Sequence, residues 1–166
     1  MKNIVEWEVK HMKNRKVLGS GYALGAHTVD NDAMSTIVDT NDEWIVSRTG
    51  IKERRISTDE NTSDLATKAA KMAIENAKID PKDIDLLICA TMTPDNITPS
   101  TACVIQGKLG LQDVKMMAFD LSAACTGFVY ALQVASYMLS EYTCALVVGV
   151  DLNSKIVDYT DRNTCI

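Results

Sequence analysis

The residues best suited to chemistry lie in the segment Asp120–Phe128, which reads Asp-Leu-Ser-Ala-Ala-Cys-Thr-Gly-Phe. Cys125 stands in it at the point where an apolar strand is expected to give way to a helix. A thiol at a helix start lies near unpaired backbone N–H groups and the positive end of the helix dipole. Both favour the thiolate, which is the nucleophilic form of cysteine. The segment therefore predicts a reactive Cys125, and the alternative is a buried cysteine that packs as a small apolar side chain.

Apolar runs and helical periodicity predict the elements that position Cys125. Strands are expected at 85–91, 115–119 and 144–150, and helices at 63–77, 100–109 and 126–139. Continuous apolar runs of this length are typical of strands buried on both faces of a parallel sheet. The alternation of strands and helices predicts an α/β fold with a largely parallel sheet and flanking helices. Cys125 then follows the carboxyl end of a strand, where such sheets gather ligand and catalytic groups.

The first third of the chain predicts smaller elements. A strand running into a turn is expected at 16–25, and a short helix at 31–38 with Asn31 as a candidate N-cap. Thr40 and Glu43 have the spacing of a capping box, which predicts a helical turn that carries Trp44 and ends before Gly50. The two long helices are each expected to place one set of residues on a common side: Leu65, Ala69, Met72, Ala73 and Asn76 in the first, and Phe128, Leu132, Ala135 and Leu139 in the second.

Composition narrows the class of protein. The 166 residues suit one ordinary domain, and 46% hydrophobic with 23% charged residues is typical of a globular chain. A net charge of -5 argues against nucleic-acid binding, and no run is long enough for a membrane span. Residues 1–13 alternate apolar and charged side chains and lack the continuous apolar core of a signal peptide, so a short N-terminal extension over residues 1–15 is expected; a real leader and an upstream start codon are the alternatives.

The five cysteines form no C-x-x-C pair, and the two histidines, His11 and His27, lie away from any cysteine cluster. The sequence therefore predicts no metal site, reduced thiols and a cytoplasmic protein.

Further blocks of sequence accompany the cysteine segment, in the order Asp42–Arg55, Thr62–Ala66, Pro99–Cys103 and Asp158–Cys165. Together with Asp120–Phe128 they resemble the 3-oxoacyl-(acyl-carrier-protein) synthase III family of thiolase-fold condensing enzymes. The resemblance covers roughly residues 16–166. It implies an incomplete N-terminal thiolase-like domain, truncated before its last strand.

The resemblance implies a reaction in two stages. Cys125 takes an acyl group from acyl-coenzyme A (acyl-CoA), and its backbone N–H helps to stabilise the oxyanion. Malonyl-acyl-carrier protein then loses carbon dioxide and attacks the acyl-enzyme, giving a 3-oxoacyl-carrier protein. Acyl-CoA is a substrate here, and no cofactor is implied. The family histidine and asparagine that assist decarboxylation belong to the second half of the family's length, so this chain is expected to be a fragment that is inactive alone.

The same resemblance assigns roles to other residues. Trp44, Arg48 and Arg162 match positions that hold CoA, since an indole and a guanidinium can enclose an adenine while another guanidinium pairs with phosphate. Thr98 stands where many members carry a phenylalanine that crosses a homodimer interface and closes the partner's acyl pocket, so a roomier primer pocket is expected. Without the resemblance, Trp44 is a packing anchor, the arginines are solvated charges and Thr98 is an ordinary loop residue.

Other interpretations stay open at this point. Lys52, Arg54 and Arg55 form a basic patch that either docks an acidic carrier protein or is simply solvated. The chain as a whole could be a noncatalytic half-fold or an accessory subunit that completes its sheet with another chain. Close relatives of the family include hydroxymethylglutaryl-CoA synthase and plant-type polyketide synthases, and a polyketide-type ketosynthase is an alternative, although the Trp44–Arg55 block favours the bacterial initiating branch over both. A thiol redox protein using Cys125 is disfavoured because no resolving cysteine lies nearby.

Overall fold

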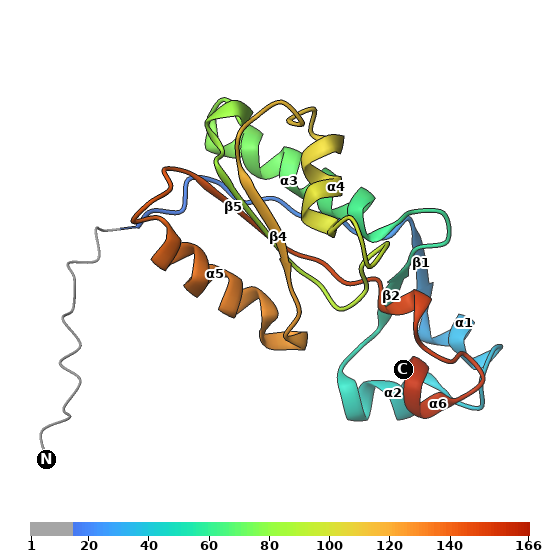
Figure 1. Cartoon of the computed structure of the whole chain (residues 1–166). Helices are drawn as coiled ribbons and strands as arrows, with labels where there is room; N and C mark the ends of the chain where they lie inside the picture. Colours follow the sequence, from blue (N-terminus) through green and yellow to red (C-terminus); the bar gives the residue numbers. More distant parts are fainter. Residues whose placement is uncertain (1–14) are drawn as a thin grey trace, which may run out of the picture.

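The computed structural model describes residues 15–166, and the expected N-terminal extension lies outside the described residues except for Arg15. The larger part of the fold is a sheet between two layers of helices (Figure 1). Its three parallel strands are β3 (Leu86–Ala90), β4 (Met117–Leu121) and β5 (Ala145–Gly149), in the order β4-β3-β5. Leu86 pairs with Met117 on one side and with Ala145 on the other, so all three strands end at the same edge. The expected parallel α/β fold is confirmed.

Helices α3 (Thr62–Ala77) and α4 (Thr101–Lys108) cover one face of the sheet, and α5 (Gly127–Met138) covers the other. Because side chains alternate along a strand, β3 contributes to both layers. Leu87 and Cys89 pack with α3 and α4, whereas Leu86, Ile88 and Ala90 pack with α5. All five residues of β3 are buried, as its uninterrupted apolar sequence predicts. The central strand is therefore the most protected element of the sheet.

The buried faces of α3 and α5 differ from those expected. The buried apolar residues of α3 are Leu65, Ala66, Ala70 and Ile74, and Met72 is 36% exposed. In α5 the buried residues are Gly127, Ala131 and Ala135, while Phe128 and Leu132 are each 44% exposed. The cause in α5 is that apolar residues surround the helix, so the sequence pattern does not single out one face. Small side chains contact the sheet there because they allow close approach of the helix.

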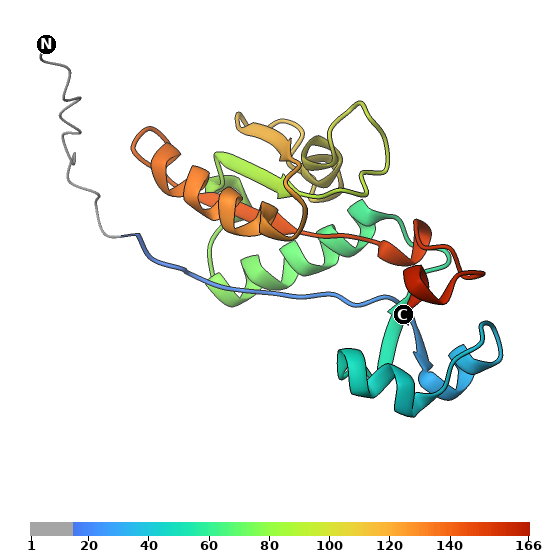
Figure 2. The ribbon, with the colours of Figure 1, turned by 90° about the horizontal axis from the view of Figure 1, so that it is seen from below.

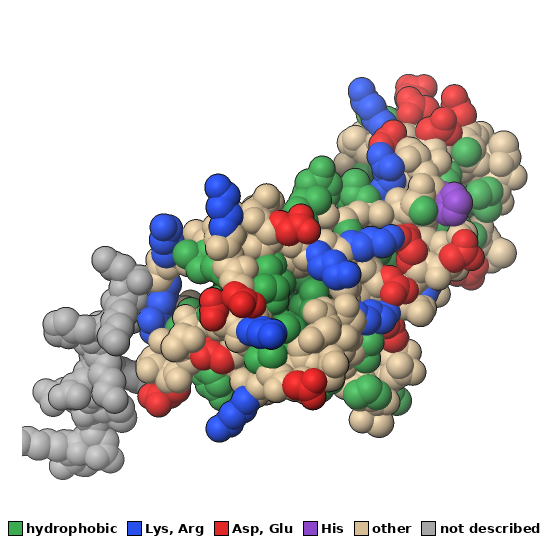
Figure 3. Space-filling view, turned by 90° about the horizontal axis from the view of Figure 1, so that it is seen from above, with side chains coloured by type: hydrophobic (Ala, Val, Ile, Leu, Met, Phe, Trp, Pro, Cys, Tyr) green, Lys and Arg blue, Asp and Glu red, His purple; other side chains and the backbone are tan. Residues whose placement is uncertain are grey.

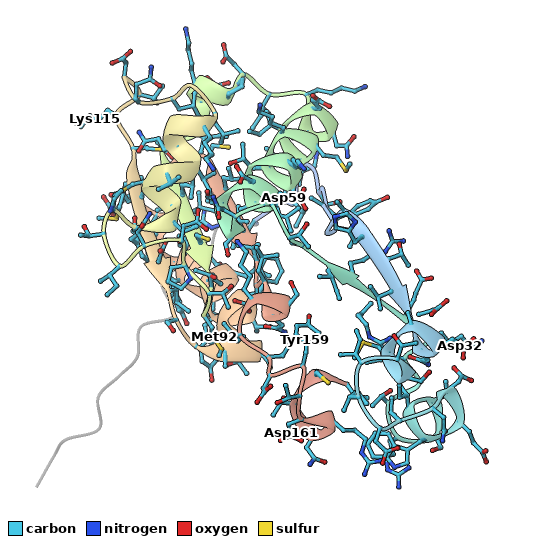
Figure 4. The ribbon with its side chains drawn as sticks, turned by 90° about the vertical axis from the view of Figure 1, so that its right-hand side faces the viewer. Asp32, Asp59, Met92, Lys115, Tyr159 and Asp161 are labelled. Atoms are coloured by element: carbon cyan, nitrogen blue, oxygen red, sulfur yellow. The ribbon has the colours of Figure 1, made fainter. Side chains whose placement is uncertain are left out.

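A second lobe is built around a two-stranded antiparallel sheet, in which β1 (His27–Asp30) pairs with β2 (Glu53–Ile56). Helices α1 (Asn31–Ser35), α2 (Asp42–Thr49) and α6 (Arg162–Cys165) pack beside it. Their shared core includes Met34, Ile45 and Cys165. Figure 4 shows the C-terminal segment, with Tyr159 and Asp161 labelled, at the same end of the molecule as the labelled Asp32 of α1. We call this part the hairpin lobe, after the antiparallel pairing of β1 with β2, which was not predicted from the sequence.

The helix caps in the hairpin lobe correct two predictions. Asp30, not Asn31, caps α1, since its carboxylate accepts a hydrogen bond from the Ala33 N–H at 2.8 Å. Asn41, not Thr40, caps α2, and its side-chain oxygen accepts from the Trp44 N–H at 2.8 Å. The Thr40 hydroxyl is buried without a hydrogen-bond partner among the described residues. The end of α2 agrees with the prediction, because Gly50 adopts the left-handed conformation that ends many helices.

Residues 15–24 are extended but belong to no strand, so the strand expected at 16–25 is not formed in the structure. The segment lies along α3 (Figure 2), where Gly19 and Gly21 make very close approaches. A Cβ at either position would come within 2.4 Å or 2.3 Å of a backbone oxygen of α3. The segment does not pair with β5, which is an edge strand of the sheet.

The connections complete the fold with three short 3-10 turns. They lie at Pro81–Asp83, before β3, at Ala124–Thr126, between β4 and α5, and at Asn153–Lys155, after β5. The second of these turns carries the cysteine singled out by sequence.

Candidate active site

Cys125 lies in the 3-10 turn that joins β4 to α5, two residues before the helix begins. Its side chain is exposed, so the alternative of a buried packing cysteine is wrong. Ala124, next to it, has a φ of 49°, which is the left-handed region that a residue with a Cβ seldom adopts. Strain of this kind costs about 1 to 3 kcal/mol and is common where a turn presents a functional side chain. The turn thus holds Cys125 outward at the carboxyl end of the sheet.

Asp120, the first residue of the cysteine segment, connects the end of β4 to α4. Its two carboxylate oxygens accept hydrogen bonds from the backbone N–H groups of Thr101 and Ala102, each at 2.7 Å. These N–H groups belong to the first turn of α4 and would otherwise lack helical partners. Ser100 caps the same helix through the Cys103 N–H at 3.3 Å. Sequence reasoning gave Asp120 no role, although an acidic residue at the end of a strand could have signalled a helix-capping partner.

Cys125 lines a cavity of about 850 Å³ between α5, β5, α3 and the extended residues 15–21. Its walls are mostly aliphatic and aromatic, and include Phe128, Leu132 and Val147. The cavity could therefore hold an apolar chain that starts at the cysteine sulfur. Because it also borders the edge of β5 that pairs with no strand among residues 15–166, a further extended segment of polypeptide could occupy part of the same space.

The other cysteines divide into buried and exposed thiols. Burial, assisted by the charge of Asp120, raises the pKa of Cys89 to about 12, so this thiol stays protonated. Burial also raises the pKa of Cys144, and Cys165 is buried in the hairpin lobe. Cys103 is exposed on α4. None of the five cysteines forms a disulfide.

The structure brings Trp44, Arg48 and Arg162 together in the hairpin lobe. The guanidinium carbons of Arg48 and Arg162 lie 4.3 Å and 4.4 Å from the centre of the Trp44 ring. Arg48 comes from the same helix as Trp44, whereas Arg162 comes from α6 and donates to the Asp39 carbonyl at 3.1 Å. Both contacts are within the range of cation–π attraction. We refer to these three residues as the Trp44 stack; Cys125, at the end of the sheet, is not part of it.

Thr98 and the basic patch, which the sequence also singled out, belong to neither the cysteine turn nor the Trp44 stack. Thr98 is exposed in the loop before α4, beside the fully exposed Ile97. Within the basic patch, Arg54 is partly buried and donates to the Val29 carbonyl at 3.3 Å and to the Asn31 side chain at 2.9 Å. Arg55 pairs with Glu53 at 3.4 Å, on the surface. Arg54 therefore has a structural role, which weakens the interpretation of the patch as a docking site.

The face of the molecule over α3 and α4 has acidic and basic side chains interspersed (Figure 3). One such pair ties the two helices, since the Lys108 ammonium lies 2.6 Å from the Asp64 carboxylate and donates to the Ser63 hydroxyl at 2.6 Å. The hydrogen bond from Lys108 lowers the pKa of Asp64, and the hydrogen bond from the Asn61 N–H lowers it further.

His27 lies in the hairpin lobe, with a ring nitrogen 3.1 Å from the Thr58 hydroxyl.

Within residues 15–166, no helix combines the length and the apolar composition that crossing a membrane requires. The described part of the chain also holds no group of three or more His, Cys, Asp or Glu side chains arranged to bind a metal ion.

Comparison with known proteins shows which condensing enzymes this arrangement resembles. Residues 119–166, which include Asp120, Cys125 and Arg162, match the family described as 3-oxoacyl-[acyl-carrier-protein (ACP)] synthase III. The beta-ketoacyl-[acyl-carrier-protein] synthase III of Clostridium acetobutylicum is 54% identical over 157 residues, which is 93% of this chain and 48% of that protein. The corresponding Clostridium botulinum protein is 53% identical over the same coverage. The chain is a half-length relative of the synthases III.

Solved structures agree with the likeness to the synthases III. A synthase III from Aquifex aeolicus matches with a TM-score of 0.87 and 44% identity, over 92% of this chain and 49% of that one. The priming beta-ketosynthase of the R1128 polyketide pathway matches with a TM-score of 0.83 and 37% identity, over 89% of this chain and 44% of that one. The expected synthase III resemblance and the half-thiolase fold are therefore confirmed, and the chain spans about half the length of the relatives it matches.

Proposed function

We propose that this chain carries the acyl-accepting nucleophile of an initiating condensing enzyme. The observation that supports the proposal best is that Cys125 is exposed at the end of the sheet and lines a largely apolar cavity. In the proposed step, the Cys125 thiolate attacks the carbonyl carbon of an acyl-CoA. The new bond joins sulfur to the acyl group, the bond to the CoA sulfur breaks, and CoA leaves as a thiolate that takes up a proton. Backbone N–H groups at the helix start, including that of Cys125, stabilise the oxyanion.

The Trp44 stack is proposed as the site for the nucleotide part of CoA. Two guanidinium groups lie over the Trp44 ring, at 4.3 Å and 4.4 Å from its centre, so an adenine would enter between the indole and one of them. The base would then stack on the indole, and the displaced arginine could pair with a phosphate. This role requires Trp44, Arg48 and Arg162 to act together, which is how the structure arranges them.

The second stage, condensation with malonyl-acyl-carrier protein, needs a histidine and an asparagine in addition to Cys125 and the Trp44 stack. Condensation with malonyl-acyl-carrier protein is proposed to occur when the chain works together with the part of the synthase III that supplies a histidine and an asparagine. The chain alone is expected to accept an acyl group on Cys125 but to release no 3-oxoacyl product. The proposed setting is the cytoplasm, where the five free cysteines would stay reduced.

Thr98 is proposed to shape the primer pocket across a homodimer interface. Its exposure in the single chain leaves it available to a partner subunit. A threonine fills less space than a phenylalanine, so primers longer than acetyl should be accepted. In the assembled enzyme, Thr98→Phe is expected to lower the rate with an octanoyl primer more than with an acetyl primer. An enzyme with Thr98 that strongly prefers acetyl would argue against this role.

The first stage can be tested on the chain itself. Incubation with acetyl-CoA, followed by peptide mass spectrometry, is expected to place one acetyl group on Cys125. Cys125→Ser should abolish the thioester, whereas Cys103→Ser, which removes the other exposed thiol, should leave it unchanged. Acetylation that follows Cys103 instead, or no thioester although iodoacetamide alkylates Cys125, would refute the proposal. A parallel treatment with hydrogen peroxide tests the redox alternative, which predicts only sulfenic acid at Cys125.

A second candidate function is that of a noncatalytic half-fold subunit. It is favoured by the outer edge of β5, which faces the cavity, has no partner strand in the described part of the chain and could accept one from another chain. Mixing the chain with the remaining half of the Clostridium acetobutylicum synthase tests both functions. Condensation that depends on Cys125 supports the catalytic role, and assembly that leaves activity unchanged by Cys125→Ser supports the accessory one.

A further inference from the structure

Asn31 is a buried polar residue that the proposed reaction does not use. Its side chain is 2% exposed and stands at the first position of α1. The amide nitrogen donates to the Asp42 carboxylate at 2.7 Å and to the Ile51 carbonyl at 2.8 Å. The amide oxygen accepts from the Arg54 guanidinium at 2.9 Å. Both N–H groups and the oxygen are therefore engaged, and only an amide of this length offers that combination here.

Two of these partners lie at opposite ends of α2. Asp42 is the first residue of the helix, and Ile51 follows Gly50, the residue that ends it. A single side chain thus holds the helix at its start and just after its end. Since α2 has only eight residues, these two contacts and its buried Ile45 define where it lies in the hairpin lobe.

The third partner connects the amide to the hairpin. Arg54 lies on β2 and also donates to the carbonyl of Val29 on β1, so it joins Asn31 to both strands. The chain of contacts therefore runs from the hairpin through Arg54 and Asn31 to α2, within the lobe seen at the lower right of Figure 4.

Helix α2 carries two members of the Trp44 stack. Trp44 lies in its first turn and Arg48 in its last, and the third member, Arg162, reaches the ring from α6. A rotation or shift of α2 would move the indole away from Arg162, because Arg162 is held separately by the Asp39 carbonyl. The geometry of the stack thus depends on the contacts that fix α2.

We propose that Asn31 is a positioning residue for the Trp44 stack, fixing α2 at both ends so that the indole stays in contact with both guanidinium groups. The inference rests on the proposed function of that stack as a site for the nucleotide part of CoA. Asn31 acts through the helix and touches no substrate. It should therefore matter for acyl donors that carry the nucleotide and not for donors that lack it.

The experiment uses the chain in a Trp7→Phe background, so that Trp44 is the sole tryptophan. Asn31→Asp keeps the size and the acceptor for Arg54, but it loses both donated hydrogen bonds and sets a second carboxylate against Asp42. Asn31→Ala loses all three hydrogen bonds without adding a charge. The matched control is Asn76→Ala, which removes an exposed asparagine bonded to the Ser20 carbonyl. CoA binding is measured by Trp44 fluorescence, and Cys125 acylation is measured with acetyl-CoA and with acetyl-pantetheine, which has no nucleotide.

Asn31→Asp is expected to weaken CoA binding about tenfold, as the loss of two hydrogen bonds donated by a buried amide predicts. Acetyl-CoA acylation at low concentration should slow by the same factor, while the acetyl-pantetheine rate stays within about twofold of the parent. Asn76→Ala should change neither. Adding Asp42→Asn to Asn31→Asp makes residue 42 the donor and residue 31 the acceptor of their hydrogen bond, and should recover part of the CoA affinity. This double variant keeps the test usable even if Asn31→Ala does not fold.

Two results would overturn the inference while leaving the proposed function in place. One is that the parent binds CoA and Asn31→Asp binds it equally well. The other is that both acyl donors slow equally, which would make Asn31 a residue of general stability only. If the parent itself shows no CoA binding, the proposed function of the stack fails, and the role of Asn31 fails with it.

Discussion

Replacing Asp120 by alanine removes the acceptor for two backbone N–H groups at the start of α4. Both bonds are 2.7 Å long, and Thr101 and Ala102, which donate them, are 1% and 0% exposed. Leaving a buried donor unpaired costs about 1 to 3 kcal/mol, so two such donors predict a loss of about 2 to 6 kcal/mol. Part of this comes from the lost carboxylate near the positive helix end, worth about 0.3 to 1 kcal/mol. The change is large against a total stability of about 5 to 15 kcal/mol for a domain.

Urea unfolding followed by far-UV circular dichroism measures this loss. Asp120→Ala should lower the midpoint without changing the slope, since the folded state buries the same surface. Asp120→Asn keeps one oxygen acceptor and should lose about half as much, about 1 to 3 kcal/mol. Asp113→Ala, which removes an exposed carboxylate after α4, serves as the control and should change stability by less than about 0.5 kcal/mol. An Asp120→Ala variant as stable as this control would show that water or a neighbour replaces the carboxylate.

Three further outcomes are expected. Lys108→Met should lower the free energy of unfolding by about 0.5 to 1 kcal/mol near neutral pH. Because the hydrogen bond from Lys108 lowers the folded-state pKa of Asp64, this difference is present above the ordinary Asp pKa of 3.8 and is lost as the pH falls through the lower folded-state pKa. A difference that persists in acid would contradict the role of Asp64. Ala124→Gly should raise the free energy of unfolding by about 0.5 to 1 kcal/mol, because glycine adopts the left-handed conformation of residue 124 without steric strain. A lower stability of this variant in thermal unfolding would argue against backbone strain at Ala124. Iodoacetamide at about pH 8 should alkylate the exposed Cys125 and spare Cys89, whose pKa of about 12 and burial protect it; modification of Cys89 in the folded chain, found by peptide mass spectrometry, would refute this.

The sheet and its helices were predictable because their signals are local. The run from Leu86 to Ala90 is apolar at every position, which suits only a strand buried on both faces, and the structure buries all five residues. The alternation of such runs with helical segments then placed Cys125 at a strand end, where the structure exposes it. The caps of α1 and α2 were each predicted one residue away from their true position, because several neighbouring side chains there can act as caps.

The hairpin lobe was not predictable in the same way. The strands β1 and β2 are four residues each, carry polar and charged side chains and lie in separate parts of the chain, so neither has a strand signal of its own. Their pairing of His27 with Ile56 becomes favourable only when the core formed by Met34, Ile45 and Cys165 assembles around it. The hydrogen bonds of Asn31 have no local signature either, since its partners follow 11, 20 and 23 residues later.

By itself, the sequence determined a parallel α/β fold and a cysteine at the end of one of its strands, because periodicity and apolar runs act over short distances. Through its resemblance it also pointed to Trp44, Arg48 and Arg162. Only the tertiary structure decided that the guanidinium groups of Arg48 and Arg162 both lie over the Trp44 ring, and that Asp120 and Asn31 hold the neighbouring helices in place. Contacts of this kind join segments far apart in the chain, and they exist only when the packing of both lobes brings their partners within hydrogen-bond distance.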